Sequence, residues 1–308
     1  MSQFKKIGGR YGFHSGSGRV KNFQVDKNLW VSGNPLFHVS GDVWYVDKNK
    51  ASGVSGDGST WSDAFMTVTE AVAAAGDYDV IFIGHGTYTE ADIIDITQNG
   101  LRIFGAGTGT YQWGKTSLNT NTAGGHLLSI NANDVEIAGM GFIIETNDKN
   151  AIQVADTAEA PWRCHIHDCH FAGNPGEIGI NCDITNDPVE LVVERCEFLD
   201  FPTCGIHLSS SRSKIMDNLF FVFTGQIGLD IHDSGEDRAW KLISDNMFVG
   251  TGTCTGIRME TATTAGSIGI FRNLFSNFST EMTSNVKEVG CINYMDDAAG
   301  GALVVPGT

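Results

Sequence analysis

Aspartates recur at one position of a repeated pattern in this sequence, and two of them could act as a catalytic pair. Asp217 and Asp245 each lie three residues before a phenylalanine, and arginines occupy the same position in the flanking repeats, Arg195 and Arg272. If successive repeats stack about 5 Å apart, the two carboxyl groups have the separation of a retaining glycosidase pair. The arginines would, however, hold both carboxylates ionised. We therefore favour a ladder of surface salt bridges at these positions.

A second polar group alternates with apolar residues later in the same repeats, and its members would share one strand face. The group consists of Asp183, His207, Asp230 and His232, with Arg258 at its edge. If the protein is a hydrolase or a lyase, its catalytic residues are expected in this group or in the aspartate pair. A polar exterior without catalysis explains the same alternation, because the outward face of an exposed strand carries polar residues. We favour this second interpretation.

The densest run of metal-binding residue types is CHIHDCH at 164–170. His165 and His167 share one strand face and could bind a metal together, but the second cysteine of the run faces the opposite way. The sequence contains no Cys-x-x-Cys pair, phosphate-binding loop, dinucleotide fingerprint or Gly-x-Ser-x-Gly motif. We therefore expect neither a metal nor a cofactor. The contacts expected instead are exterior salt bridges of His167 and His170 with Glu194 and Glu197 of the next repeat.

These side chains are positioned by a repeat of 22 to 29 residues, in which an aliphatic residue is followed five positions later by phenylalanine. The six pairs are Ile137 and Phe142, Ile166 and Phe171, Val193 and Phe198, Ile215 and Phe220, Ile243 and Phe248, and Ile270 and Phe275. Apolar and polar residues alternate within each repeat, which predicts strands with one face in a core. The spacing from each phenylalanine to the next strand barely changes, so the insertions must fall in one loop, as in a solenoid.

Two positions before each phenylalanine lies a column of residues that predicts an inward ladder. Its members are Met140, Cys169, Cys196, Asn218, Asn246 and Asn273. Stacked asparagines bond through their side-chain amides from one coil to the next, and cysteine is a small buried substitute. All seven cysteines, an odd number without a pairing pattern, are expected to be reduced.

The repeat predicts an all-β fold, a right-handed parallel β-helix over residues 43–295 with about eight coils. Residues 63–75 carry apolar residues at helical spacing after Ser62, a candidate N-cap. We expect a helix there that covers the N-terminal end of the core. Residues 1–42 are predicted to form an extended, basic, glycine-rich arm, and residues 296–308 a C-terminal tail.

The segments that open the repeat region resemble those of a known family. VWYVDKN at 43–49, the loop GVSGDGSTWSDAF at 53–65 and VIFIGHGTYTE at 80–90 are similar to the first coils of pectin-lyase-like β-helix proteins, and the resemblance covers about residues 43–295. This superfamily includes polysaccharide lyases and hydrolases, phage tailspikes and other virion proteins. In its enzymes, acidic residues of adjacent coils on one outward sheet face bind calcium or act as acid and base. The fold does not choose among these functions.

Charge is divided unevenly along the chain. The net charge is −16, yet residues 1–27 hold six Lys or Arg side chains against one Asp, a net charge of +5. The acidic body lacks the basic footprint of a nucleic-acid-binding protein. No apolar run is long enough to predict a membrane span. No apolar stretch near the N-terminus predicts a signal peptide, so we expect a protein made in a host cytoplasm.

Together these features favour a structural bacteriophage protein over an enzyme. We expect a capsid cement, or decoration, protein of the virion, which forms a homotrimer at local three-fold points of the shell. Its partner would be the major capsid protein or another virion protein, bound through basic residues of the arm, Lys5, Lys6, Arg10, Arg19 and Lys21. The alternatives are a tailspike-type polysaccharide depolymerase and a non-catalytic glycan-binding appendage. Trp162 and Trp240 are the candidate contacts to a host glycan.

Overall fold

The protein divides into two compact units, Met1–Val39 and Ser40–Thr308. A computed structural model describes residues 41–107, 116–120, 125–144, 149–154, 161–173, 177–182, 190–210, 212–231, 240–259 and 267–282, and the backbone of six further short strands. In the first unit, β1 (Lys5–Ile7) pairs antiparallel with β2 (Arg10–Gly12), and β3 (Trp30–Val31) with β4 (Asn34–Pro35).

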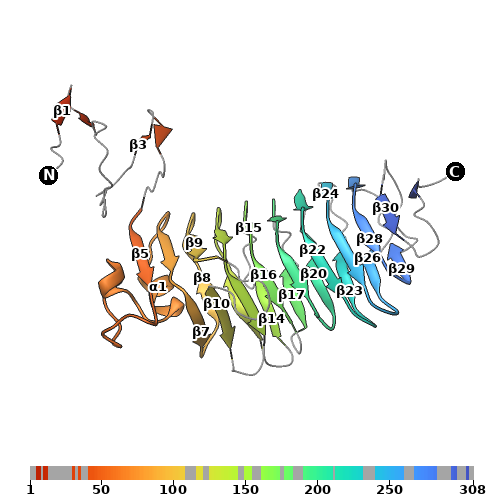
Figure 1. Cartoon of the computed structure of the whole chain (residues 1–308), viewed down its shortest axis with the longest axis horizontal. Coiled ribbons are helices and arrows are strands. Elements are labelled where there is room, and N and C mark those ends of the chain that lie inside the picture. Colours follow the sequence, from red (N-terminus) through yellow and green to blue (C-terminus); the bar gives the residue numbers. More distant parts are fainter. Residues whose placement is uncertain are drawn as a thin grey trace, which may run out of the picture. The chain divides into compact units, whose positions relative to one another are not determined.

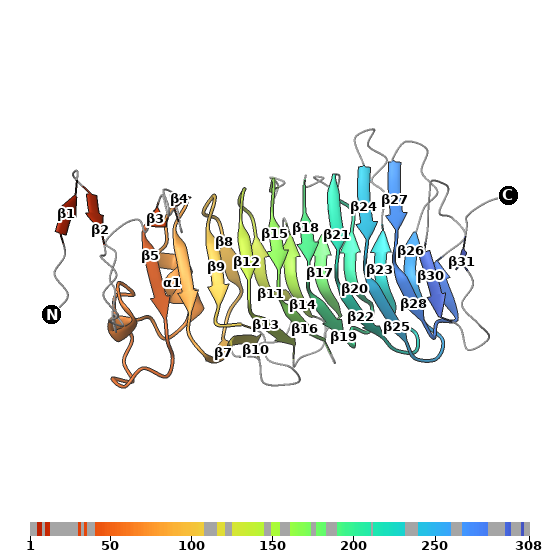
Figure 2. The ribbon, with the colours of Figure 1, turned by 45° about the horizontal axis from the view of Figure 1, so that its top comes forward.

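The second unit is built from three long sheets of stacked strands (Figures 1 and 2). Sheet I contains β5 (Val43–Val46), β6 (Val80–Ile83), β9 (Arg102–Gly105), β12 (Glu136–Ala138), β15 (His165–His167), β18 (Val192–Glu194), β21 (Ser213–Met216), β24 (Trp240–Ser244) and β27 (Ser267–Phe271). Sheet II contains β7 (Gly86–Glu90), β10 (Thr116–Thr120), β13 (Gly141–Ile144), β16 (His170–Ala172), β19 (Glu197–Leu199), β22 (Leu219–Val222), β25 (Met247–Gly250), β28 (Leu274–Ser276), β30 (Asn293–Asp296) and β31 (Leu303–Val304). Sheet III contains β8 (Ile94–Ile96), β11 (Gly125–Ile130), β14 (Lys149–Val154), β17 (Ile178–Cys182), β20 (Cys204–Leu208), β23 (Ile227–Ile231), β26 (Thr255–Met259) and β29 (Thr280–Met282).

The chain passes from sheet I to sheet II to sheet III and then returns to sheet I one level further on. Strands that are three apart in the sequence therefore pair in parallel along most of the unit, for example β15 with β18 and β18 with β21. This is a parallel β-helix, and it confirms the predicted all-β solenoid. The predicted tail begins within β30 and includes β31, which pairs antiparallel with β30.

The six phenylalanines of the repeat form one stack in the core. Successive pairs are in register across sheet II. Their ring centroids lie 4.6–4.9 Å apart and their planes are within 4–9° of parallel. The spacing follows from the distance between hydrogen-bonded strands, so an identical side chain in every coil produces a continuous ladder. The predicted aromatic column is confirmed.

The column two residues before the phenylalanines lies in the turn from sheet I to sheet II and is buried, as predicted. Asn218 Nδ2 donates to Asn246 Oδ1 at 3.0 Å, and Asn246 Nδ2 donates to Asn273 Oδ1 at 2.9 Å. Cysteine takes over the same role in earlier coils. The thiol of Cys196 donates to the carbonyl of Ile166, just as Asn246 Nδ2 donates to the equivalent carbonyl one coil before it.

The α-helix of the described residues, α1 (Val68–Ala74), lies at the β5 end of the second unit, after a 3-10 turn at Trp61–Asp63 (Figure 1). The predicted span 63–75 is wrong at its start. The N-cap is Thr67 and not Ser62, because Thr67 forms a capping box with Glu70. The helix buries Val68 and neighbouring apolar residues in the core cluster, which confirms that it covers this end of the core. No helix in the described ranges is long and apolar enough to cross a membrane.

Candidate functional site

The polar row predicted on sheet III exists, and its central carboxylate is buried. Asn181, His207, Asp230 and Arg258 lie side by side on β17, β20, β23 and β26. Arg258 donates two hydrogen bonds to Asp230, from Nε to Oδ1 at 2.8 Å and from Nη2 to Oδ2 at 2.6 Å. His207 Nδ1 lies 3.4 Å from Asp230 Oδ2, and the Asp230 side chain is 1% exposed.

The chemistry of Asp230 is dominated by Arg258. Burial alone would raise the pKa of Asp230, but the hydrogen bonds from Arg258 and His207 outweigh it and lower this pKa to about 2. A carboxylate with this pKa is a poor general acid and a weak base near neutral pH. Ligand atoms of Cys204, His207 and Asp230 lie within 4.8 Å of one another. The guanidinium at Asp230 disfavours a second cation there.

The aspartate pair of the sequence is not a symmetric pair in the structure. Asp245 accepts two hydrogen bonds from Arg272, both at 2.7 Å, and these lower the pKa of Asp245. Asp217 is exposed, and its carboxylate has no ion pair or hydrogen bond among the described residues. Arg195 donates two hydrogen bonds to the carboxylate of Asp168 in the preceding coil, at 2.8 and 2.9 Å. It pairs with this residue and not with Asp217 of the next coil. The predicted salt-bridge ladder is therefore present but interrupted.

The backbone explains why these charged side chains form one outward column. Asp168, Arg195, Asp217, Asp245 and Arg272 all have φ between 51° and 60°, the left-handed region. Each is the first residue after a sheet I strand, at the sharp turn into sheet II. Two other predicted site residues, Asp183 and His232, lie outside the described residues, as do Arg19 and Lys21. Of Lys5, Lys6 and Arg10 the structure gives the backbone, in β1 and β2.

A different cluster lies on the outer face of sheet I, and we call it the histidine cluster: Glu136, His165, His167 and Glu194. In the sheet, His165 lies opposite Glu136 of the preceding coil, and His167 lies opposite Glu194 of the next coil. The side-chain contacts run diagonally. His167 Nε2 is 3.1 Å from Glu136 Oε1, His165 Nε2 is 3.2 Å from Glu194 Oε1, and the two ring centroids are 4.2 Å apart.

The sequence prediction found part of this cluster. The expected contact of His170 with Glu197 is confirmed at 3.1 Å. His167 lies beside Glu194 as expected, but its hydrogen bond goes to Glu136, which sequence reasoning missed. Glu136 could have been found, because it precedes Ile137 as His165 precedes Ile166, and so falls in the same outward column. Burial and the neighbouring charge of His167 lower the pKa of His165.

An open groove of about 560 Å³ borders the histidine cluster on sheet I. It is lined by Arg163, Cys164, His165, Glu190, Val192, Glu194, Arg212, Lys214 and Met216. Beside it Trp162 is 42% exposed, and the guanidinium of Arg212 lies 5.8 Å from the centre of its ring. The groove thus offers cations and one aromatic surface to a solute. The side chain of Trp240 lies outside the described residues.

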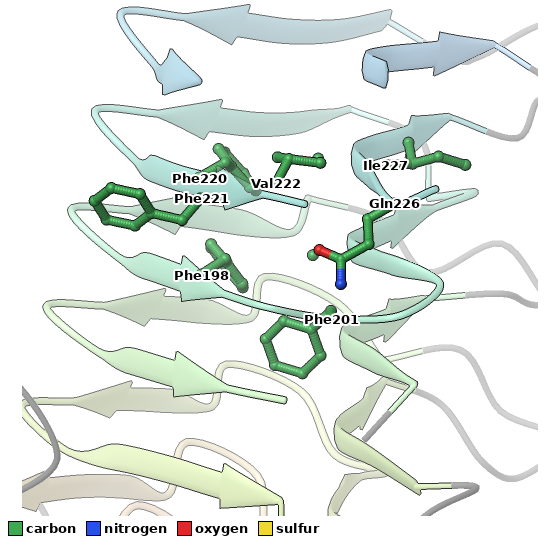
Figure 3. A pocket seen from close by; sticks show the side chains of 9 residues that line it. Phe198, Phe201, Phe220, Phe221, Val222, Gln226 and Ile227 are labelled. Carbon is green, nitrogen blue, oxygen red and sulfur yellow. The ribbon is translucent and has the colours of Figure 1, made fainter. Parts of the chain in front are cut away.

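A second cavity lies inside the coil and is too small for a ligand. It is lined by residues of sheets II and III and of the connections between them, among them Phe198, Phe201, Phe220 and Gln226 (Figure 3). Its volume of about 10 Å³ leaves room for one water molecule at most.

No family model and no curated protein matches the sequence. Solved structures with a similar chain path include pectin methylesterase PemA from Erwinia chrysanthemi, at 14% identity over 77% of this chain and 78% of that one, TM-score 0.43. Pectate lyase Pel9A is 10% identical over 81% of this chain and 79% of that one, TM-score 0.42. The Dettilon tailspike protein is 13% identical over 77% of this chain and 50% of that one, TM-score 0.40.

Proposed function

We propose that the protein is a non-catalytic structural component of a bacteriophage virion, a trimeric capsid decoration protein that docks through its N-terminal arm. The observation that carries this proposal is the division of charge between the two units. Residues 1–39 hold six basic side chains against one acidic one, a net charge of +5, which leaves −21 on residues 40–308. A cationic segment joined to an acidic body is suited to bind an acidic surface of another protein.

The state of the candidate catalytic groups supports a structural role. Glycan hydrolysis needs one carboxyl group with a raised pKa as the acid and a second one as base or nucleophile. Among the described candidates, the pKa values of Asp230 and Asp245 are lowered by paired arginines. The arginine favours the ionised form of each carboxylate, so neither group holds the proton that a general acid needs near neutral pH.

The second unit supplies the stiffness that a decoration protein needs. Its phenylalanine and asparagine ladders link each coil to the next along the core. A closed ring of three such bodies would match the symmetry of the local three-fold points in a capsid. The protein would be made in the host cytoplasm and join the shell after assembly.

The test compares the full chain with an arm of reversed charge, Lys5→Glu, Lys6→Glu and Arg10→Glu. The matched control keeps the charge with Lys5→Arg, Lys6→Arg and Arg10→Lys. We expect the wild-type chain and the control to co-sediment with virus particles that lack the protein, at three copies per site, and the reversed variant to remain in the supernatant. Sedimentation of the free protein should give three times the chain mass of 33.1 kDa. Equal binding by the reversed variant, or no binding by any chain, would refute the proposal.

The groove on sheet I favours a second candidate, a glycan-binding appendage that takes an acidic polysaccharide. Trp162 offers a stacking face, and Arg163, Arg212 and Lys214 offer cations to uronate carboxylates. Titration with an oligouronate should show binding that Trp162→Ala weakens at least tenfold, while a neutral oligosaccharide does not bind. Release of reducing ends or unsaturated products that Asp217→Asn and Asp245→Asn abolish would instead establish a depolymerase.

A further inference from the structure

The histidine cluster contains four side chains of metal-binding types from three successive coils. Glu136 comes from β12, His165 and His167 from β15, and Glu194 from β18. The contacts of His167 with Glu136 and of His165 with Glu194 run along parallel diagonals of the strand lattice. The two histidines share one strand, and their ring centroids lie 4.2 Å apart, so ligand atoms of Glu136, His165 and His167 come together, while Glu194 contacts His165.

A carboxylate lies at each ring nitrogen of His167. Asp168 Oδ2 lies 2.6 Å from its Nδ1, and Glu136 Oε1 lies 3.1 Å from its Nε2. A neutral imidazole has one N–H and satisfies one of these two acceptors. The other contact sets a ring nitrogen lone pair against a carboxylate oxygen, which is the arrangement of two ligands that share a metal ion. A second proton on the ring is the competing explanation.

We propose that Glu136, His165 and His167 bind one divalent transition-metal ion of the zinc class, with the fourth position left to water or a solute. Ligand atoms of these three residues lie within 4.8 Å of one another. Zinc takes His nitrogen and carboxylate oxygen at about 2.0–2.2 Å, so neighbouring ligands of a tetrahedral ion lie about 3.4 Å apart. The observed 3.1 Å between His167 Nε2 and Glu136 Oε1 is close to that edge length.

The residues next to the cluster have the arrangement that orients a metal ligand. Asp168 holds Nδ1 of His167, which fixes the ring with Nε2 toward Glu136. Arg195 holds Asp168 in turn, with two hydrogen bonds of 2.8 and 2.9 Å, and also lies 3.3 Å from His167 Nδ1. A carboxylate on the far nitrogen of a ligating histidine is the common outer contact of zinc sites. Asp168 is therefore a positioning residue of the site.

The charges around the cluster are compatible with a bound cation. Arg102 lies 3.4 Å from Glu136, and Arg195 donates to Glu194 at 2.5 Å. With Asp168, three carboxylates face these two guanidinium groups, so the cluster keeps an excess negative charge when both imidazoles are neutral. Because His165 and Glu194 also line the groove, the ion would lie at the edge of the groove. An anionic group of a solute in the groove would complete four-coordination of the ion.

The experiment uses the full, tag-free chain after dialysis against a chelator. Zinc is titrated by calorimetry and cobalt(II) by visible absorption, whose bands report coordination by four ligands. We expect one ion per chain. His165→Ala, His167→Ala and Glu136→Gln should each weaken binding at least tenfold, and Asp168→Asn should weaken it about 10- to 100-fold with the cobalt bands retained.

His170→Ala is the matched control, since this histidine pairs with a glutamate outside the cluster and should bind zinc as the wild type does. Far-UV circular dichroism of every variant checks the fold, and Glu136→Gln keeps the test valid if a histidine variant fails to fold. Absence of saturable binding by the wild-type chain would mean that a proton holds the cluster together, and the proposal would fall. Equal affinity of the wild type and His167→Ala, or loss of binding only in His207→Ala, would overturn it as well. Neither result bears on docking by the arm.

Discussion

Replacement of Asn246 by alanine tests whether the asparagine ladder stabilises the β-helix. The Asn246 side chain is buried and makes four hydrogen bonds. Its Oδ1 accepts from N and Nδ2 of Asn218, both at 3.0 Å, and its Nδ2 donates to Ile215 O and Asn273 Oδ1, both at 2.9 Å. Alanine removes all four and leaves the backbone N–H of Asn218 without its acceptor in a dry interior.

The expected loss of stability depends on which hydrogen bonds the neighbouring residues keep. Asn218 Nδ2 still donates to Val193 O, and Asn273 Oδ1 still accepts from the backbone N–H of residue 246. Each lost bond with a surviving alternative costs about 1 kcal/mol, and a stranded buried N–H costs about 1–3 kcal/mol. We expect Asn246→Ala to lower the free energy of unfolding by about 4 kcal/mol.

The chain itself provides the matched control, because cysteine occupies the same column at Cys169 and Cys196. Asn246→Cys fills most of the volume and restores a donor to the carbonyl of Ile215, as the Cys196 thiol does for Ile166. We expect Asn246→Cys to lower the free energy of unfolding by about 2 kcal/mol, which is half the effect of alanine.

Equilibrium urea unfolding, followed by far-UV circular dichroism, measures both variants. Amide hydrogen exchange locates the effect. Asn218 N–H should lose protection in Asn246→Ala, whereas Cys196 N–H, which donates to the retained Asn218 side chain, should keep it. The reasoning is refuted if the free energy of unfolding of Asn246→Ala lies within about 1 kcal/mol of the wild type, because one stranded donor plus the lost bonds should cost much more. It is also refuted if Asn246→Cys is less stable than Asn246→Ala.

Three further predictions concern the aromatic stack, a close backbone approach and the buried ion pair. Phe220→Ala removes a ring whose centroid lies 4.8 and 4.6 Å from the rings on either side, and should cost about 3–5 kcal/mol in urea unfolding. Gly228→Ala would bring a Cβ within 2.7 Å of a carbonyl oxygen of the next coil, whereas Gly76 has only a 3.7 Å neighbour. Gly228→Ala should lower the midpoint of thermal unfolding, and Gly76→Ala should change this midpoint by no more than a few degrees. The folded-state pKa of Asp230 is lowered from 3.8 to about 2, so its contribution to stability is present above pH 3.8 and is lost as the pH falls to about 2. Asp230→Asn should remove that part of the acid dependence, and an unchanged acid-unfolding curve would contradict the assignment.

The phenylalanine and asparagine ladders could be predicted from sequence because each coil of a parallel β-helix has the same kind of side chain at the same position. Phe198 and Phe220 are 22 residues apart and Phe142 and Phe171 are 29 apart, yet both pairs stack. The loop between the repeated strands accommodates the difference in length. The position of a residue within the repeat therefore determines its partner in the next coil. The same logic identified Cys196 as a substitute for asparagine before any contact was known.

Pairing within the outward columns could not be predicted in the same way. Arg195 has an aspartate one coil before it and another one coil after it, Asp168 and Asp217, and the repeat treats the two as equivalent. The structure selects Asp168, whose carboxylate also accepts from His167 of its own strand. Such choices depend on side-chain rotamers and on third partners, which spacing does not encode.

The start of the helix was predictable in principle but required a different signal. Thr67 and Glu70 form the Thr-x-x-Glu pattern of a capping box, and this signal outranks Ser62, which lies within the preceding 3-10 turn. Burial of Asp230 was not predictable, because a side chain on an outward strand face is exposed unless other parts of the chain cover it.

The two outer faces show how one strand lattice produces either a closed ion pair or an open cluster. On sheet III, Asp230 is followed in the next coil by Arg258, whose planar guanidinium donates to both carboxylate oxygens and puts a positive charge beside them. On sheet I, Glu136 is followed by His165, whose imidazole contacts Glu194 of the next coil, while His167 of the same strand contacts Glu136. Ligand atoms of Glu136, His165 and His167 therefore lie within 4.8 Å of one another, where the proposed metal ion would bind. Because these groups lie outside the ladders that hold the coils together, binding at the histidine cluster can be altered without removing any contact of the core.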